Sequence, residues 1–300
     1  MAKISVLIST YNGERYIEEQ LDSIFAQTFD DFHVYIRDDG SSDGTCQVID
    51  EYIERRGVYD MISFEKGNNI GFCASFMKLL KSTPEGECWA FCDQDDVWMP
   101  EKLEYAYRWM MDNNNTKPLL YHSGFEVANE DLSVRKAYPR SEFDYKFYNS
   151  ITCNIFFGFS VVINGTLRNM LLQASPENIK YHDWFAAMIT AAFGKYHLST
   201  KIEAIHRQYE KNASPLYFFK KIPHGFKLIA GERFYNMQAR EFLRLYGDYL
   251  PAKDRRILEW FTADKYSFKT ACRKAFYRKR WNPQIKVEII LRGLMLLGFI

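Results

Sequence analysis

Ile4-Ser5-Val6-Leu7-Ile8-Ser9-Thr10, close to the N-terminus, is the stretch that decides the fold. It is a short run of aliphatic and β-branched residues, which is typical of a strand. Tyr11-Asn12-Gly13 follows as a turn, and residues 17–25 then carry apolar side chains at helical spacing. A strand, a turn and an amphipathic helix in this order predict the beginning of a β-α-β unit.

The same order of signals repeats over the first 120 residues. Further strands are predicted at 33–37, 61–65 and 88–92, each followed by a helical pattern. Repeated β-α-β units imply right-handed crossovers and a mainly parallel sheet flanked by helices. The fold class that we expect is therefore α/β and Rossmann-like, with ligands bound beyond the carboxyl ends of the strands.

After Leu119 the pattern loosens. We expect a buried strand at 156–163, a helix at 182–193 and extended chain at 196–209. Beyond about Pro215 the chain is aromatic, basic and helical in pattern, without clear strand signals.

The composition is that of an ordinary folded protein. Of 300 residues, 47% are hydrophobic and 26% are charged, and the net charge of +1 gives no sign of nucleic-acid binding. The N-terminus lacks the charged and apolar regions of a secretory signal, and the six scattered cysteines fit a reducing compartment. We therefore expect a cytoplasmic protein.

Asp93-Gln94-Asp95-Asp96 is an acidic loop directly after the predicted strand 88–92. Carboxylates this close repel one another unless a positive charge lies among them. Mg²⁺ and Mn²⁺ prefer carboxylate oxygen, and they hold substrate phosphates through one or two carboxylates and water. The loop indicates a site for a metal ion and a diphosphate. On its own, it also fits a solvated loop that caps the next helix.

Two more polar loops belong to the same edge of the predicted sheet. Ser9 to Gly13 ends the first strand, and Asp38-Asp39-Gly40-Ser41-Ser42-Asp43-Gly44 ends the strand 33–37. The serines and glycines of the second loop fit turn and helix-cap chemistry. Asp39 is a candidate for accepting the imide N–H of a uracil or thymine ring.

Together these features resemble family 2 glycosyltransferases of the GT-A fold. The resemblance rests on Ser5 to Asn12, Asp38 to Ser41, Asn69-Ile70-Gly71 and Asp93 to Asp96, in this order and spacing. It covers about residues 1–210, and the later His182-Asp183-Trp184 is most similar to a bacterial rhamnosyltransferase-like branch. We therefore expect a GT-A catalytic domain at 1–215, followed by a helical, basic C-terminal region at 216–300 that lies outside the resemblance.

The resemblance implies an inverting transferase that depends on Mg²⁺ or Mn²⁺. Its donor would be a dTDP- or UDP-sugar, with dTDP-rhamnose a candidate, and its acceptor a glycan or lipid-linked hydroxyl in bacterial surface polysaccharide synthesis. The family pattern assigns Asp183 as the general base and Asp95 and Asp96 as metal ligands. It assigns nucleotide-sugar binding to Ser9, Tyr11, Asp39, Asn69, Gly71, Asp93 and Arg207.

The chemistry of inversion agrees with the role of Asp183. Inversion needs attack from the face opposite the leaving group, and a carboxylate there can take the proton of the acceptor hydroxyl. Asp183 also fits the N-cap of the helix 182–193, as a purely structural residue. We expect His182 to be a structural neighbour.

One departure from the family follows the last core strand. The family often carries Tyr-Arg-Gln-His-Gly-x-Asn there, with the His near the metal, whereas this chain has His206-Arg207-Gln208-Tyr209-Glu210-Lys211-Asn212. Tyrosine is a poor magnesium ligand at neutral pH because its phenol is rarely ionised. Either the metal depends on carboxylates, diphosphate and water, or His206 substitutes. Arg207 and Lys211 are candidates for holding the diphosphate.

The C-terminal region has its own pattern. From Pro251 onward basic residues outnumber acidic ones, and Val287 to Ile300 is largely apolar but too short to span a bilayer comfortably. This segment fits an interfacial helix on the inner face of an anionic membrane, where a lipid-linked acceptor would lie. It fits a helix packed on the catalytic domain equally well.

Two other classes of function can be compared with this one. A nicotinamide-dependent oxidoreductase needs a glycine-rich fingerprint after the first strand, and Thr10-Tyr11-Asn12-Gly13-Glu14 lacks it. A catalytically decayed sugar-nucleotide-binding or scaffolding protein is the alternative that stays open. Tyr209 favours it, and intact carboxylates at 39, 95, 96 and 183 count against it.

Overall fold

The computed structural model describes residues 2–113, 116–138, 143–209, 234–263 and 265–300. The chain divides into two compact units. The first spans Met1–Pro139, Phe156–Leu172 and Tyr181–Tyr209, and the second spans Arg140–Ile155, Gln173–Lys180 and Glu210–Ile300. The expected domain boundary between residues 215 and 216 lies outside the described residues, as does Lys211.

The first unit is built on one sheet, which has nine strands in the described part of the chain, in the order β3-β2-β1-β4-β8-β6-β9-β5 with β7 beside β6. The strands are β1 (Ile4–Thr10), β2 (Phe32–Asp38), β3 (Ile62–Lys66), β4 (Cys88–Cys92), β5 (Val97–Trp98), β6 (Leu119–Ala128), β7 (Arg135–Ala137), β8 (Val161–Asn164) and β9 (Lys195–Arg207). β3, β2, β1 and β4 are all parallel, as the sequence predicts. The other half of the sheet is mixed, because β8 runs antiparallel to both β4 and β6.

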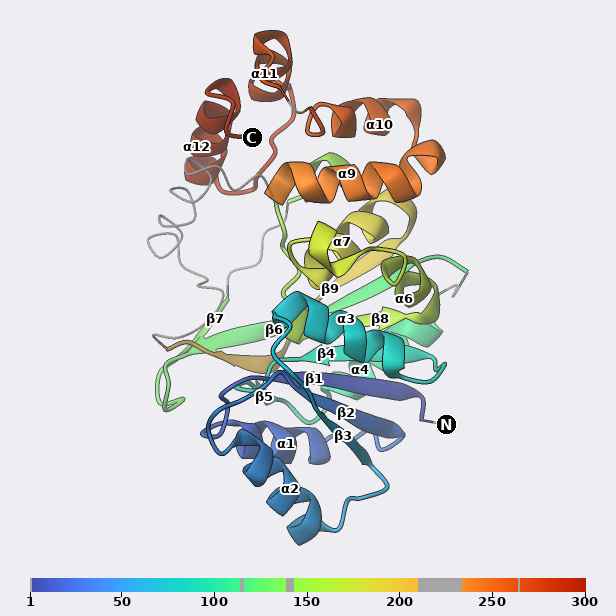
Figure 1. Cartoon of the computed structure of the whole chain (residues 1–300), viewed down its shortest axis with the longest axis vertical. Coiled ribbons are helices and arrows are strands. Elements are labelled where there is room, and N and C mark those ends of the chain that lie inside the picture. Colours follow the sequence, from blue (N-terminus) through green and yellow to red (C-terminus); the bar gives the residue numbers. More distant parts are fainter. Residues whose placement is uncertain (1, 114–115, 139–142, 210–233, 264) are drawn as a thin grey trace. The chain divides into compact units, whose positions relative to one another are not determined.

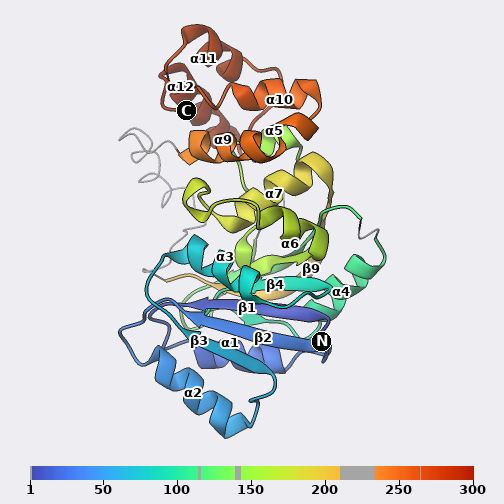
Figure 2. The same ribbon diagram turned by 45° about the vertical axis from the view of Figure 1, so that its right-hand side comes forward.

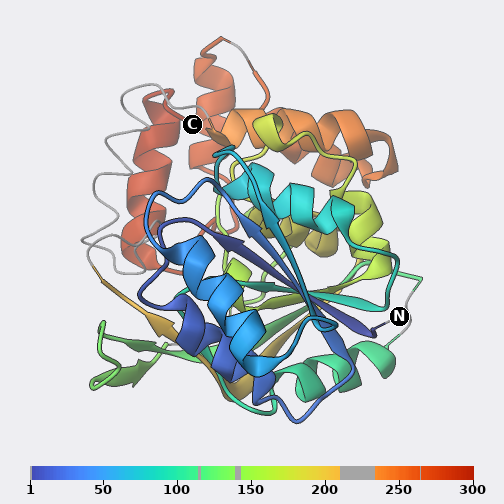
Figure 3. The same cartoon turned by 60° about the horizontal axis from the view of Figure 1, so that its bottom comes forward.

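Helices cover both faces of this sheet. They are α1 (Ile17–Phe25), α2 (Thr45–Arg56), α3 (Phe72–Ser82), α4 (Lys102–Met111), α6 (Gly165–Leu171) and α7 (His182–Phe193). In Figures 1 and 2, α3, α6 and α7 lie above the strands, and α1 and α2 lie below them. Figure 3, seen from below, shows the blue helices α1 and α2 in front of the strands. The α/β fold with flanking helices is thus confirmed.

Burial on both faces explains why β1 decides the fold. Ile4, Val6, Leu7 and Ile8 are each 0% exposed. A parallel strand covered on both sides has no solvent face, so its sequence is a continuous apolar run rather than an alternating one. Each such side chain contributes about 1.5–3 kcal/mol on burial.

One predicted strand is shorter in the structure than in the sequence pattern. The apolar run 156–163 forms a 3₁₀ turn at Gly158–Ser160 and becomes strand β8 only at Val161. The Ser160 N–H bonds back to Phe157 O (2.9 Å), and the Ser160 hydroxyl donates to Ser123 O (2.9 Å). The first of these bonds is local and the second joins residues 37 apart in the sequence, and no periodicity of apolar residues could reveal either.

The described part of the second unit is helical, which confirms the expected helical C-terminal extension. It contains α5 (Phe147–Ser150), α9 (Phe234–Tyr246), α10 (Ala252–Glu259), α11 (Phe268–Ala275) and α12 (Ile285–Leu296). Trp281 is fully buried against Phe261, with ring centroids 5.2 Å apart, and its indole N–H donates to Lys274 O at 2.9 Å. This tryptophan is the centre of the unit's own small core.

Helix α12 has two apolar faces. Leu291, Leu294 and Met295 are buried, whereas Ile285, Ile289, Ile290 and Leu297 are exposed. At helical spacing the exposed residues form one stripe, defined here as the α12 stripe: Ile285, Lys286, Ile289, Ile290 and Leu297. None of the described helices is both long enough and apolar enough to cross a membrane.

We predict that Gly40→Ala destabilises the protein more than Gly57→Ala. Both glycines have positive φ, 79° and 65°, so alanine is strained at either position. A Cβ at Gly40 would also lie 2.8 Å from Asn69 N, whereas a Cβ at Gly57 meets nothing within 4 Å. We expect losses of about 3 kcal/mol and about 1 kcal/mol, measured by urea denaturation. Equal losses would contradict a close approach between the two loops.

Candidate active site

Three loops meet at one edge of the sheet because three strands end there. β1 lies between β2 and β4, all parallel, with Thr10 opposite Asp38 and Ile8 opposite Cys92. The loops that follow, Tyr11–Gly13, Asp39–Gly44 and Asp93–Asp96, therefore project from neighbouring strands in the same direction. This is the edge at which parallel sheets of α/β proteins bind ligands.

Side-chain hydrogen bonds to the backbone join the three loops. Gln94 pairs with the main chain of Tyr11 in both directions, accepting its N–H (2.8 Å) and donating to its carbonyl (3.1 Å). Asn12 N–H donates to Ser41 Oγ, and Asn12 Oδ1 accepts from Ser42 N–H, each at 2.9 Å. The acidic loop and the Asp38–Gly44 turn are thus both fastened to the end of β1.

Asp38 organises its own turn. Its carboxylate accepts from the Thr10 hydroxyl (2.9 Å) and from the N–H groups of Gly40 (3.1 Å) and Ser41 (2.8 Å). Burial raises the pKa of Asp38, but the hydrogen bonds from Ser41 and Thr10 outweigh burial and hold that pKa below its ordinary value. The hydrogen bonds of the Asp38 carboxylate thus go to its own turn and to the end of β1.

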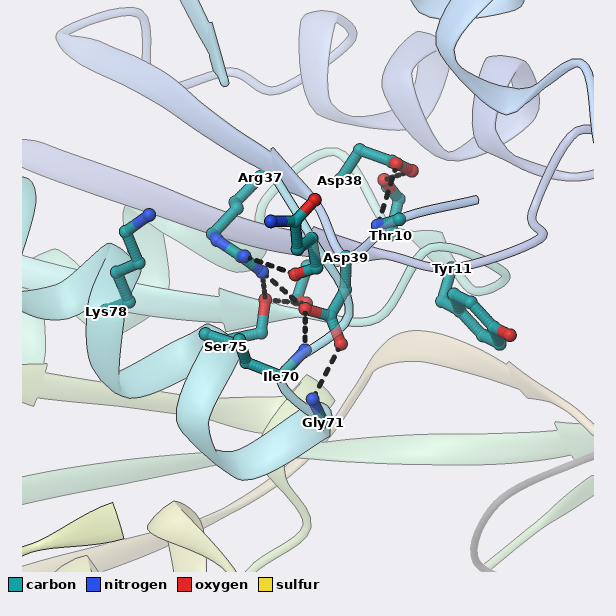
Figure 4. A network of polar contacts seen from close by, with 12 residues as sticks. Thr10, Tyr11, Arg37, Asp38, Asp39, Ile70, Gly71, Ser75 and Lys78 are labelled. Atoms are coloured by element: carbon teal, nitrogen blue, oxygen red, sulfur yellow. Dashed lines mark hydrogen bonds and ion pairs between the residues drawn. The ribbon is translucent and has the colours of Figure 1, made fainter. Parts of the chain in front are cut away.

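Asp39 is held quite differently (Figure 4). Its Oδ1 accepts from Arg37 Nη1 (2.6 Å) and from Ile70 N–H (2.9 Å), and its Oδ2 accepts from Gly71 N–H (2.9 Å). Arg37 and Asp39 are 1% and 3% exposed. A charge-assisted pair and two backbone donors fix the carboxylate in one orientation.

The other residues expected on the nucleotide side lie close by. The ring of Tyr11 is 50% exposed, and Asn69 and Gly71 are exposed on the loop that carries the donors to Asp39. Ser9 is partly buried, and its hydroxyl bonds to that of Ser75 on α3 at 2.6 Å. Tyr11 is therefore accessible to a ligand, whereas the hydroxyl of Ser9 is hydrogen-bonded to helix α3.

The three carboxylates of the acidic loop differ in exposure. Asp96 is 0% exposed and Asp95 is 8% exposed, whereas Asp93 is partly open to solvent. Burial, then the neighbouring charge of Asp96, raises the pKa of Asp95 to about 6. Burial and the charges of Asp96 and Asp95 also raise the pKa of Asp93 well above its usual range. The loop thus carries more negative charge than its surroundings balance.

Asp96 is balanced by a buried histidine. Its Oδ1 accepts from His206 Nδ1 (2.8 Å) and from the N–H of Arg207 (3.2 Å), while its Oδ2 is buried without a hydrogen-bond partner among the described residues. Burial lowers the pKa of His206, but Asp96 outweighs burial and raises that pKa above its ordinary value. The imidazole stacks on Phe159, with centroids 4.2 Å apart. His206 is therefore a buried residue that orients Asp96 and offsets its charge.

Tyr209, which stands where the family often has histidine, holds Asp95. Its hydroxyl donates to Asp95 Oδ2 at 2.7 Å, and its ring lies 5.1 Å from that of Tyr16. Arg207 points its guanidinium at protein groups: it donates to Asp95 O (3.0 Å), to the Glu130 carbonyl and to the Glu19 carboxylate. In this conformation Arg207 therefore stabilises the acidic loop through the Asp95 carbonyl.

Asp183 is the second residue of α7, and the N-cap position is held by Tyr181 without a side-chain cap. Asp183 is partly exposed, and its Oδ1 accepts the N–H of Trp184 at 2.7 Å. Its charge is one of the weaker causes that raise the pKa of Asp93, so the two carboxylates lie within electrostatic range. His182 is fully buried among Phe72, Phe76 and Phe91, and burial lowers its pKa to about 3.

The carboxylates can hold a divalent cation only together with a ligand. Among the described residues, no three His, Cys, Asp or Glu side chains group as a complete metal site. The unpartnered Oδ2 of Asp96 and the raised pKa values of Asp93 and Asp95 nevertheless mark surplus negative charge. Mg²⁺ is commonly bound by one or two carboxylates plus substrate phosphates, and these residues fit that arrangement.

Sequence reasoning missed several residues of this site. Gln94 lies between carboxylates in the sequence, but its partner Tyr11 is 83 residues away. His206 was expected as a possible metal ligand, but its bond to Asp96, which spans 110 residues, was not predicted. Arg37 gave one signal that could have been used, since a charged residue inside a strand covered on both faces needs a buried partner.

Comparisons with known proteins agree with this geometry. The family model described as Glycosyl transferase family 2 matches residues 5–165, more than half of the 300 residues. The chain is 26% identical over 211 residues to the dTDP-rhamnosyl transferase RfbG of Shigella flexneri, covering 68% of this chain and 72% of that protein. It is 25% identical over 186 residues to the UDP-Glc:alpha-D-GlcNAc-diphosphoundecaprenol beta-1,3-glucosyltransferase WfgD of Escherichia coli, covering 62% and 69%.

Other relatives are longer than the matched region. An uncharacterized glycosyltransferase of Nostoc sp. is 38% identical over 104 residues, which is 34% of this chain and 31% of that protein.

Solved structures share the fold. S. aureus TarS 1-349 in complex with UDP has a TM-score of 0.57 and 21% identity, covering 92% of this chain and 75% of that chain. This chain spans 46% of a longer TarS structure. The mannosyltransferase PcManGT from Pyrobaculum calidifontis, in complex with GDP-Man and Mn²⁺, has a TM-score of 0.53 and 18% identity, covering 99% and 87%. At these identities the likeness shows the GT-A fold.

We predict that Asp95→Asn stabilises the metal-free protein at pH 8. The pKa of Asp95 is about 6 in the folded chain, above its ordinary value of 3.8. Wild-type stability should therefore fall as pH rises from about 4 to about 6, and the full penalty should persist above that window. Asparagine removes the charge, for a gain on the order of 2–3 kcal/mol at pH 8 that vanishes below pH 4.

The measurement is urea denaturation with a chelator present, at pH values between 4 and 8. Asp131→Asn is the control, because Ser133 hydrogen-bonds that surface carboxylate and lowers its pKa, so its removal should not stabilise. A destabilised Asp95→Asn protein at pH 8 would show that the repulsion is already balanced.

Proposed function

The chain belongs to glycosyl transferase family 2, and from this premise we propose that it transfers a sugar from a nucleoside-diphosphate donor to an acceptor hydroxyl with inversion. The observation that carries the proposal is the convergence of a fixed carboxylate, an acidic loop and a partly exposed second carboxylate, Asp183, at one sheet edge. RfbG and WfgD, which resemble this chain, are named as a dTDP-rhamnosyl and a UDP-glucosyl transferase.

Uracil and thymine share an imide N–H, and an ionised carboxylate can only accept hydrogen bonds. Asp39 is suited to take that N–H, with the exposed Tyr11 ring as a surface on which the base stacks. We therefore assign a UDP- or dTDP-sugar as donor, with Asn69, Gly71 and Ser9 shaping the base pocket.

The diphosphate would lie against the acidic loop. Asp93 is partly exposed and Asp95 is 8% exposed, and together with Asp96 they would hold Mg²⁺ or Mn²⁺ jointly with the donor. Such an ion neutralises negative charge on the diphosphate leaving group. Gln94 and Tyr209 contribute by fixing the loop and Asp95 before the donor arrives. Arg207 supports the same loop from the Asp95 carbonyl.

Asp183 is the residue that we assign as general base. An inverting transfer needs a carboxylate on the acceptor side, within hydrogen-bond reach of the attacking hydroxyl. Asp183 is partly exposed, and the N–H of Trp184 orients its carboxylate through Oδ1 at 2.7 Å. Trp184 is 7% exposed, so it supports the turn rather than the acceptor.

We predict that Asp183→Asn abolishes transfer and leaves donor affinity within about threefold of wild type. Asparagine keeps the hydrogen bond to Trp184 but takes no proton, and removal of a general base costs about 10²–10⁴ in rate. The measurement is turnover on a panel of UDP- and dTDP-sugars, with Mn²⁺ and with a chelator, beside calorimetric donor affinity. The matched control is Asp254→Asn, which makes the same change in the first turn of α10.

The alternative, a catalytically decayed scaffolding protein, predicts the opposite result for the wild-type chain. It expects donor binding without turnover in the wild-type chain, whatever sugar and metal are supplied. Loss of donor affinity together with turnover in Asp183→Asn would instead assign that residue to folding or binding.

We further propose that the acceptor is glycan or lipid-linked, that the enzyme serves bacterial surface polysaccharide synthesis, and that it works at the inner face of the cytoplasmic membrane. WfgD, by its name, acts on a diphosphoundecaprenol-linked sugar. In the second unit, the α12 stripe exposes Ile289 (66%) and Leu297 (71%), and Arg278, Lys279, Arg280 and Lys286 are exposed beside it in sequence. An apolar helix face with basic neighbours suits an anionic bilayer surface.

We predict that Ile289→Glu lowers recovery with anionic vesicles in flotation, because it places a negative charge in the α12 stripe. Val134→Glu is the matched control, since Val134 is also a β-branched residue, also 66% exposed, on the hairpin between β6 and β7. Vesicles of phosphatidylcholine with and without phosphatidylglycerol separate apolar from electrostatic binding. Equal recovery of wild type and both variants would contradict a membrane role for the stripe.

A further inference from the structure

Arg37 is a buried cation that the proposed mechanism does not use. It lies in β2 between two parallel neighbours, and it is 1% exposed. Burying a guanidinium without good partners is costly, so a chain that keeps one inside a sheet has a specific use for it. The partners of Arg37 all belong to the segments that surround Asp39.

The guanidinium reaches three segments at once (Figure 4). Its Nη1 donates to Asp39 Oδ1 (2.6 Å) and to Ser75 Oγ on α3 (2.9 Å), and its Nη2 donates to Asn68 O (2.8 Å). A Cβ on Gly67 would overlap Nη2, so the loop before Asn68 is shaped around the guanidinium. Arg37 thus ties Asp39, the 67–71 loop and the start of α3 into one rigid group.

This group determines which part of the Asp39 carboxylate remains available. A carboxylate offers about four acceptor positions. Among the described residues, Arg37 and Ile70 N–H take two on Oδ1, and Gly71 N–H takes one on Oδ2. The remaining position is on Oδ2. In Figure 4, Arg37 and the exposed ring of Tyr11 lie on opposite sides of the Asp39 carboxylate.

We propose that Arg37 is the positioning residue for base recognition, holding Asp39 so that one oxygen of its carboxylate is left to accept the imide N–H of the donor base. The inference rests on the proposed function, because it requires a nucleoside-diphosphate donor. Since three donors converge on the Asp39 carboxylate, its remaining position is that of an acceptor, and the site selects bases with an N–H at that edge, such as uracil and thymine. Cytosine, which presents an unprotonated ring nitrogen there, is rejected.

The test compares each nucleotide with its N3-methyl form, which lacks the imide N–H. Calorimetry measures the affinities of UDP, N3-methyl-UDP, dTDP and CDP for the full chain with Mn²⁺. For wild type we expect N3-methylation to weaken UDP binding by about tenfold or more, as for a hydrogen bond to a charged group. We call the Kd of N3-methyl-UDP divided by the Kd of UDP the methylation ratio. It reports on that hydrogen bond alone, because the diphosphate makes the same contacts in both nucleotides.

The variants are Arg37→Met and Arg37→Lys. Arg37→Met leaves Asp39 without its cation, and we expect the methylation ratio to fall below about threefold. Lysine keeps the charge but cannot bridge Asp39, Ser75 and Asn68 in one plane, so Arg37→Lys should give an intermediate ratio and should keep the protein folded. Melting curves accompany each measurement.

Arg168→Lys is the matched control. Arg168 is another buried arginine of the same unit, 5% exposed, and it bonds to the carbonyls of Leu80 (3.2 Å) and Thr83 (2.9 Å). Those carbonyls precede β4, at the sheet edge opposite Asp39, so the control should keep the wild-type methylation ratio.

The outcomes separate two failures. A wild-type ratio in folded Arg37→Lys, or in Arg37→Met, would reduce Arg37 to a packing role while leaving the proposed function intact. A wild-type chain that binds UDP and N3-methyl-UDP equally, or binds no nucleotide, would remove the base contact itself and the proposal with it.

Discussion

The repulsion among the carboxylates at the end of β4 is the constraint around which the first unit is organised. Three parallel strands deliver their loops to one edge, and one of those loops carries three negative charges in four residues. Asp96 is 0% exposed, so water cannot screen its charge and protein groups must balance it. His206 on β9 does so with a hydrogen bond of 2.8 Å between its Nδ1 and Asp96 Oδ1. The parallel register of β1, β2 and β4 therefore determines where the charge gathers. The antiparallel pairing of β5 with β9, in which Val97 lies opposite Ile205, brings His206 to Asp96.

Neighbouring acidic residues in this site have opposite tasks, and their hydrogen-bond partners decide which. Asp38 and Asp39 are adjacent and equally buried, but Asp38 bonds within its own turn whereas Asp39 bonds across to another loop and to Arg37. The same division separates Asp96, which faces His206, from Asp95, which faces Tyr209. In each pair the two carboxylates are therefore fixed by different parts of the chain, although they are neighbours in the sequence.

This division also explains what the sequence could and could not predict. Apolar runs and their spacing predicted β1 and β4 with the observed bounds and α7 as a helix from His182 to Phe193, because burial on both faces and helical periodicity are local properties. The acidic loop and the Asp38-Asp39 turn were recognisable because they lie next to strands in the chain. Arg37, Gln94 and His206 act on partners brought near only by folding, as the 110 residues between His206 and Asp96 illustrate. No local pattern encodes such a pairing.

Tyr209 shows how the departure from the family pattern fits into this charge balance. A histidine at that position could add positive charge or bind a metal directly, and a phenol does neither. The Tyr209 hydroxyl instead donates one hydrogen bond to Asp95, which steadies the carboxylate and leaves its charge in place. His206 stands three residues earlier, and its imidazole is buried and bonded to Asp96. Burial and the neighbouring carboxylates therefore keep the pKa values of Asp93 and Asp95 above their ordinary range, because the phenol at position 209 brings no positive charge to offset them.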